Sequence, residues 1–232
     1  MKLTVPKLCS YLGGIFLIAV GVNLSKMAGL GISPVASLPY AVELSWGIEL
    51  GIATAIVYVF LILLQLVLLR KLSVLPFLQL LTTVVMSVFT TLTSPDYLLR
   101  WLPRPDAYLQ SLLFLAISII LIGIGVYFYI NPNYVPLPSE GIAKTITEIS
   151  NGKIQFHNSK IIVDCSLVVS AIIVTLLMMG KVAGVREGTV ITALLVGKMV
   201  GLCKMIDQKI TPKTMDGERK SDEPLCIPED SD

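Results

Sequence analysis

The sequence predicts an all-α polytopic membrane protein whose six transmembrane helices form two inverted-topology repeats of three. The first observation is composition: of 232 residues, 54% are hydrophobic and 15% are charged, whereas soluble domains average roughly 45–50% and about 25%. The second is a set of six long apolar segments, and the third is a pair of proline-bearing interruptions at corresponding places. This composition excludes a soluble enzyme and a disordered chain. With a net charge of only +2 and no dense basic stripe, nucleic acid is not an expected partner.

The apolar segments define the domain organisation. A helix that spans a bilayer needs about 20 mostly apolar residues. The segments that meet this requirement are Leu8–Ser25, Ile48–Leu69, Val74–Thr93, Leu109–Ile130, Ile161–Gly180 and Glu187–Ile206. We therefore expect a first three-span repeat over residues 1–93 and a second over residues 109–206. The charged remainder, residues 207–232, is expected to be a disordered cytoplasmic tail.

The distribution of positive charge predicts the orientation. With the N-terminus in the cytoplasm, twelve Lys and Arg residues fall on the cytoplasmic side and five on the opposite side. Cytoplasmic loops of membrane proteins carry the excess of Lys and Arg. Both termini are therefore expected in the cytoplasm.

Two stretches between the spans, residues 26–47 and 131–150, combine a Gly- or Pro-rich entry with a short helix-prone segment. We expect half-helices near residues 33–45 and 138–150. Ser33 can cap the first, and Pro34 suits the first helical position. Pro138 stands at the start of the second, where the Glu140 carboxylate complements the positive end of the helix dipole. The alternative is that both stretches are ordinary extramembrane loops with a short surface helix.

An internal repeat relates the two stretches. A shift of 104 positions lays Leu17–Leu44 on Leu121–Glu148 without a gap. The identical pairs are Leu17/Leu121, Ile18/Ile122, Gly21/Gly125, Val22/Val126 and Pro34/Pro138. Because each half contains three spans, an odd number, the second half enters the membrane upside down. In transporters of this architecture the broken helices meet near the midplane and direct their N-termini at a bound solute.

Several stretches resemble a known family. The stretch from GLGISPVASLPYAV to VLLRK, together with VDCSLVVSAII and GVREGTVITALLVGK, is similar to YczE/YitT-type bacterial integral membrane proteins. The resemblance covers residues 10–205, and its most specific parts are SPxxSLPY and REGTxxxALLVG. A proline often follows LVG in that pattern, where this chain has Lys198. The resemblance implies a six-span protein of the bacterial cytoplasmic (inner) membrane and leaves the activity open.

The candidate substrate site lies at the half-helix starts, where hydroxyl groups and one carboxylate are available. Its residues are Ser33, Pro34, Ser37, Pro138, Ser139 and Glu140. Among them, Glu140 is the best candidate for a cation or proton site.

Ionisable residues within spans are costly and mark functional positions. Asp164 and Lys198 are expected to pair, because the lysine stem can reach toward the membrane surface. Such a pair would serve coupling or gating, or only structure, and Asp164 could alternatively be an interfacial cap. Arg186 and Glu187 open the last span and are candidates for an outer mouth, unless Glu187 only complements the helix dipole. Polar Asn23 and Gln65 are expected to hydrogen-bond across helices.

The predicted function is that of a secondary transporter or permease that moves an unknown small polar solute by alternating access. The motifs HExxH, GxSxG, the Walker loop and a dinucleotide-binding loop are missing. We therefore expect no enzymatic activity, no cofactor and no metal, and a drive from an ion gradient or a separate protein. The alternatives are a substrate-capture subunit of an importer and a non-transporting assembly or regulatory factor. Glycine spacings such as Gly197/Gly201 indicate close packing within the chain, or a homodimer face.

Overall fold

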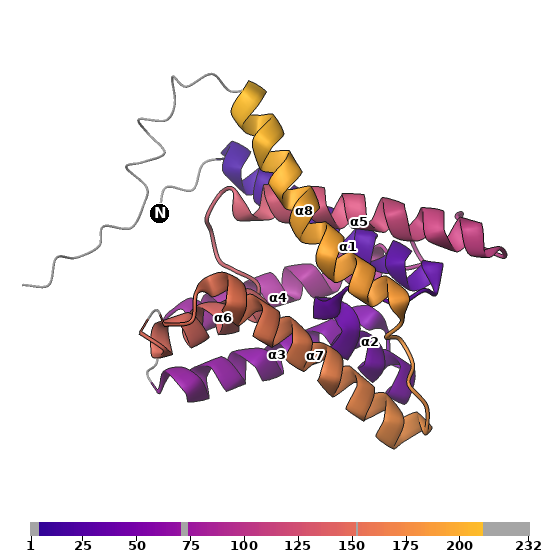
Figure 1. Ribbon diagram of the computed structural model, residues 1–232, viewed down its shortest axis with the longest axis horizontal. Coiled ribbons are helices and arrows are strands. Elements are labelled where there is room, and N and C mark those ends of the chain that lie inside the picture. Colours follow the sequence, from indigo (N-terminus) through magenta and orange to yellow (C-terminus); the bar gives the residue numbers. More distant parts are fainter. Residues whose placement is uncertain (1–4, 71–73, 152, 211–232) are drawn as a thin grey trace, which may run out of the picture.

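The computed structural model describes residues 5–70, 74–151 and 153–210, which form eight α-helices and no strand (Figure 1). Six helices are long and apolar enough to cross a membrane. These are α1 (Val5–Ala28), α3 (Leu50–Leu69), α4 (Val74–Leu92), α5 (Tyr108–Ile130), α7 (Phe156–Met179) and α8 (Glu187–Ile210). The two short helices are α2 (Pro34–Trp46) and α6 (Pro138–Ile149). The predicted class, an all-helical multi-pass membrane protein, is confirmed.

The helix bounds differ from the expected ones at two places. Helix α7 begins at Phe156, more than a turn before the apolar segment, because its first residues are polar or aromatic but still helical. Helix α8 continues to Ile210, so residues 207–210 of the expected tail are helical. The rest of that tail, residues 211–232, lies outside the described residues.

Burial is distributed as a bilayer requires. Large apolar side chains such as Phe60 and Leu81 are exposed on the outer faces of the long helices. Polar side chains such as Asn23, Gln65 and Gln79 are fully buried between helices. Asn23 on α1 donates hydrogen bonds to the Thr90 carbonyl (2.8 Å) and the Thr93 hydroxyl (2.9 Å) at the end of α4. The predicted interhelical bond of Asn23 is therefore present, whereas the Gln65 carbonyl oxygen has no partner within the described ranges.

The two halves meet where α1 crosses α5. A Cβ atom at Gly14 would lie 2.7 Å from the Gly125 carbonyl oxygen, and one at Gly21 would lie 3.0 Å from the Ser118 carbonyl oxygen. Gly14, early in α1, approaches Gly125, late in α5, whereas Gly21, later in α1, approaches Ser118, earlier in α5. The two helices therefore run antiparallel. The shift of 104 positions converts one contact into the other. The α1–α5 crossing therefore has the two-fold symmetry of an inverted repeat.

Most other helix pairs also have a counterpart, obtained when each helix is replaced by its equivalent in the other repeat. Helix α2 packs on α7 as α6 packs on α3, and α1 packs on α4 as α5 packs on α8. Likewise α2 packs on α3 as α6 packs on α7. One pair has no such counterpart: α3 packs along α4, but among the described residues α7 does not pack along α8. Figure 1 shows α8 in the layer of α1 and α5, separated from α7 in the layer of α3, α4 and α6.

The segment before α2 is attached to the start of α8. The Ile32 amide donates to the Gly184 carbonyl at 3.3 Å, and the Gly188 amide donates to the Leu30 carbonyl at 2.8 Å. Gly31 has a left-handed φ of 111°, and a Cβ there would lie 2.9 Å from the Arg186 backbone nitrogen. This close approach requires glycine. Backbone contacts thereby join the two halves at one end of the molecule, which we call the closed end.

Candidate functional site

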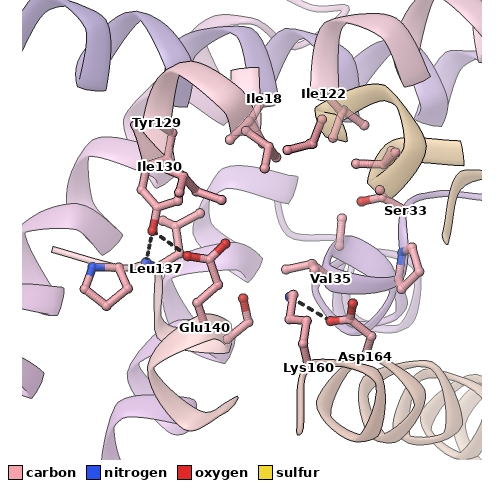
Figure 2. A pocket seen from close by; sticks show the side chains of 18 of the residues that line it. Ile18, Ser33, Val35, Ile122, Tyr129, Ile130, Leu137, Glu140, Lys160 and Asp164 are labelled. Atoms are coloured by element: carbon pink, nitrogen blue, oxygen red, sulfur yellow. Dashed lines mark hydrogen bonds and ion pairs between the residues drawn. The ribbon is translucent and has the colours of Figure 1, made fainter. Parts of the chain in front are cut away.

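A cavity of about 570 Å³ lies between the two layers and is lined by residues of all eight helices. Figure 2 shows Ile18 of α1 and Ile122 of α5 on one side of it, and Lys160 and Asp164 of α7 on the other. Ile18 and Ile122 are equivalent in the repeat, so the cavity lies beside the α1–α5 crossing. A central cavity at a repeat interface is where transporters of this architecture bind their solutes.

Both short helices begin at this cavity. Proline at the first helical position favours the helical φ and restricts the preceding residue to extended backbone, as observed for Ser33 and Leu137. The cavity lining includes Ser33 and Pro34 from the first break and Ser139 from the second. The backbone N–H groups of a helix's first turn lack partners within the helix, so both starts offer donors and partial positive charge.

The serine residues at the two helix starts are buried. Ser33 is 7% exposed and Ser139 is 1% exposed, and both line the cavity. Within the described part of the chain, neither hydroxyl has a hydrogen-bond partner. The other predicted serine, Ser37, donates to the Ser33 carbonyl at 3.1 Å and does not line the cavity, and neither does Pro138. The structure thus brings four of the six predicted substrate residues to one place: Ser33, Pro34, Ser139 and Glu140.

Glu140 is held by α5. The Tyr129 hydroxyl donates to its carboxylate oxygen at 2.9 Å, and the Leu137 amide donates to the Tyr129 oxygen. Burial raises the pKa of the Glu140 carboxyl above its ordinary value, while the Lys160 charge and the Tyr129 hydrogen bond partly oppose burial. The neighbouring Asp164 charge acts in the same direction as burial. An acid whose pKa is raised by burial in a cavity is a candidate group for proton uptake and release.

Asp164 has a different partner from the expected one. Lys160, one turn earlier on α7, pairs with it at 2.8 Å, and both side chains line the cavity (Figure 2). Lys198 is exposed on α8 and makes no ion pair with Asp164. The physical reason is the separation of α7 from α8, which the two spans' hydrophobicity did not indicate. The pairing is therefore corrected to Lys160–Asp164.

Arg186 and Glu187 lie away from the cavity. Arg186 donates to the Gly29 carbonyl at 3.0 Å and pairs with Glu187 at 3.2 Å. Their side chains are 55% and 47% exposed, and neither lines the cavity. Both belong to the closed end of the molecule, next to the backbone contacts around Gly31.

The cavity continues toward the opposite end. Its lining there includes Asn133 and Tyr134, before α6, and Phe156 and His157, at the start of α7. Lys144 of α6 also lines it. Within the described residues, no group of three His, Cys, Asp or Glu side chains is arranged to hold a metal. The polar groups present suit reversible binding through hydrogen bonds and charge.

Sequence reasoning missed Tyr129 and Lys160 as site residues. The spacing of Lys160 and Asp164, one helical turn, was a usable signal for an ion pair. Tyr129 had no such signal, because an aromatic residue at a span end is common at membrane interfaces.

The fold and cavity define a class: a multi-pass α-helical membrane protein with an inverted repeat and a central cavity. The chain belongs to the family of unknown function DUF6198, which matches residues 5–205. This range agrees with the extent of the resemblance seen in the sequence. No curated protein and no solved structure matches the chain.

Proposed function

We propose that the protein is a secondary transporter that binds one small solute in the central cavity and moves it by alternating access. The observation that carries the proposal is the meeting of Ser33 and Ser139 at one cavity. Ser33 immediately precedes α2 and Ser139 is the second residue of α6, so the two serines stand at the starts of equivalent short helices of opposite halves. Both hydroxyls are free to bind a solute.

The asymmetry of the two ends supports this proposal. The end near Gly31 is closed by bonds between the segment before α2 and the start of α8. The cavity instead reaches the other end, along Tyr134 and His157. In an inverted repeat, exchange of the conformations of the two halves closes one end and opens the other. The described state then corresponds to one of two states, open on the side of His157.

Glu140 is the proposed site of a coupling proton or cation. Its carboxylate lies between Tyr129 and the cavity, and burial raises its pKa. A proton exchanged at this position changes the charge of the cavity by one unit, and this changes the affinity for a charged solute. The excess of Lys and Arg in the loops on the His157 side supports the proposal that this side faces the cytoplasm of a bacterial inner-membrane protein. We expect no catalysis and no cofactor.

A ligand screen tests the proposal. The purified protein is heated with members of a metabolite library, since a ligand stabilises the state that binds it. A hit should protect the wild type, and affinity should fall about tenfold in the double variant Ser33→Ala, Ser139→Ala, because two hydrogen bonds are lost. Ser166→Ala is the matched control, because Ser166 is exposed on α7 and bonds its own helix.

Counterflow in proteoliposomes then separates the candidate functions. Exchange of a labelled hit across the membrane supports a transporter. Binding without exchange would contradict the transporter and favour a substrate-capture subunit. A screen with no ligand at all would favour the non-transporting factor.

A further inference from the structure

The pair α7 and α8 breaks the symmetry of the fold. The equivalent pair α3 and α4 is tightly joined: the Ser87 hydroxyl donates to the Gly51 carbonyl at 2.7 Å, and a Cβ at Gly51 would lie 2.6 Å from the Ser87 carbonyl oxygen. Along α7 and α8, the described residues make no comparable packing. Each spanning helix has one most apolar stretch, and the buried share of that stretch is 56% for α1, 22% for α7 and 12% for α8. A gap between two spanning helices faces acyl chains.

The central cavity reaches this gap from inside. Its lining includes Ile161 of α7, which is 48% exposed, and Val196 and Val200 of α8. Figure 1 shows α7 and α8 lying apart from each other beyond the segment that connects them. Residues of both separated helices therefore line the cavity, as do Tyr134 and His157 at the other end.

The cavity lining has an apolar part and a polar part. Most of its lining is apolar, from Ile18, Val22, Met86, Ile122, Val126 and Val196. The lining also contains the hydroxyls of Ser33 and Ser139, the Lys160 ammonium and the starts of two helices. Helix N-termini, hydroxyls and an ammonium group together bind oxyanions. Both carboxyl groups in the lining have partners: Asp164 pairs with Lys160, and Glu140 accepts from Tyr129. The Lys160 ammonium has three N–H donors, so it can bind an oxyanion beside this pair.

We propose that the space between α7 and α8 is a lateral portal that admits an amphiphile with an oxyanion head and an apolar tail from the bilayer. The head binds at Ser33, Ser139 and Lys160, and the tail lies along the apolar lining toward Val196. This inference rests on the proposed function, because it names the class of solute for the same cavity. A phosphate or carboxylate of a lipid-like molecule fits, whereas a free inorganic anion has nothing to fill the apolar part.

Binding of dodecyl phosphate to the full-length protein in phosphatidylcholine nanodiscs tests the portal. We expect dodecyl phosphate to raise the melting temperature, and neither inorganic phosphate nor dodecyltrimethylammonium to do so. Val196→Trp fills the portal and should weaken binding at least about tenfold, as fully burying an apolar tail is worth several kcal/mol. Leu194→Trp is the matched control, since Leu194 is 65% exposed on the same helix and does not line the cavity.

A second measurement uses the unaltered protein, so that misfolding of a variant cannot decide the result. A fatty acid with a diazirine in its tail is photo-crosslinked, and the modified peptides are mapped by mass spectrometry. We expect crosslinks at cavity-lining positions in residues 156–164 and 192–200. Crosslinks confined to outward-facing residues such as Leu177 and Leu194 would contradict the portal.

The remaining outcomes each decide the proposal. Equal protection by inorganic phosphate, or by the cationic amphiphile, would overturn it, and so would unchanged binding in Val196→Trp. A dimer in native mass spectrometry, joined by a disulfide through Val196→Cys, would place a second copy in the gap and also overturn it. Amphiphile binding without exchange across the membrane would leave the portal intact and refute only the transporter.

Discussion

Glu140 shows how single residues create the site. The first turn of α6 brings the Glu140 carboxylate to the cavity. The hydroxyl of Tyr129, on α5, donates a hydrogen bond to this carboxylate at 2.9 Å and holds it there. The charged groups that face it are Lys160 and Asp164 of α7 and Lys144 of its own helix. Burial has the largest effect on its pKa and raises it above the value of an exposed glutamate.

The first prediction is a pH-dependent difference between the wild type and Glu140→Gln. A raised folded-state pKa contributes stability that is complete below the unfolded value of about 4.3 and is lost as the pH rises through the folded value. Melting temperatures measured at rising pH above the unfolded value should therefore fall more steeply for the wild type than for Glu140→Gln. The control Glu187→Gln, at a side chain 47% exposed, should keep the wild-type slope. Parallel curves for the wild type and Glu140→Gln would contradict the raised pKa.

The second prediction concerns Asn23, which joins α1 to the end of α4 by two hydrogen bonds. Asn23→Ala removes both bonds and leaves the Thr90 carbonyl without this donor, so we expect a loss of about 1–2 kcal/mol in unfolding free energy. Titration with sodium dodecyl sulfate measures it. Asn158→Ala provides the control, because Asn158 is exposed on α7. Equal stability of the two variants would show that the bonds contribute nothing.

Individual partners were the least predictable feature. Lys198 was expected to pair with Asp164 because both stand within apolar spans, yet the partner is Lys160. Hydrophobic pattern locates a span along the chain but does not say which spans pack together. The separation of α8 from α7 therefore could not be read from composition.

At the scale of elements, glycine positions decide how α1 and α5 cross. Gly13 and Gly14 are neighbours in the chain but have opposite surroundings. A Cβ at Gly14 would lie 2.5 Å from the Tyr129 backbone nitrogen, whereas a Cβ at Gly13 would meet nothing within 4 Å. The crossing thus depends on one glycine of the pair.

The third prediction compares Gly14→Ala with Gly13→Ala. At Gly13 the change should be neutral or stabilising by up to about 1 kcal/mol, because alanine is the better helix former. At Gly14 the same change forces α1 away from α5 and should cost about 1–3 kcal/mol. Thermal unfolding of both variants in the same detergent measures the difference. If Gly14→Ala is as stable as Gly13→Ala, the close antiparallel crossing is wrong.

The elements themselves were largely predictable. Long apolar runs located all six spans, and proline at the first helical position located α2 and α6 to within a residue or so. The start of α7 at Phe156 was missed because His157, Asn158 and Lys160 lower the apolar content of its first turns. Helix propensity and hydrophobicity thus suffice to locate the helices. They do not locate helix ends that extend beyond the apolar stretch.

At the scale of the whole molecule, the repeat explains both the symmetry and its interruption. The glycine and proline matches at a shift of 104 positions predicted which residues are equivalent, and the contacts of Gly14 and Gly21 follow that relation. The same relation makes α2 and α6 equivalent, and the starts of both helices, with Ser33 and Ser139, lie at one cavity. The unequal ends and the unpaired α7 and α8 depend on tertiary packing, which the repeat alone does not determine.

The most direct test of the central claim is thiol labelling at the two helix starts. The four native cysteines are replaced by alanine, and Ser33→Cys and Ser139→Cys are introduced singly. His157→Cys and Lys181→Cys serve as markers for the two membrane faces. A membrane-impermeant thiol reagent is then applied to sealed vesicles of each orientation. We predict that each marker reacts from one face only, and that both serine positions react from either face. Labelling of Ser33→Cys and Ser139→Cys from a single face in every condition, or from opposite faces, would contradict one shared cavity with alternating access.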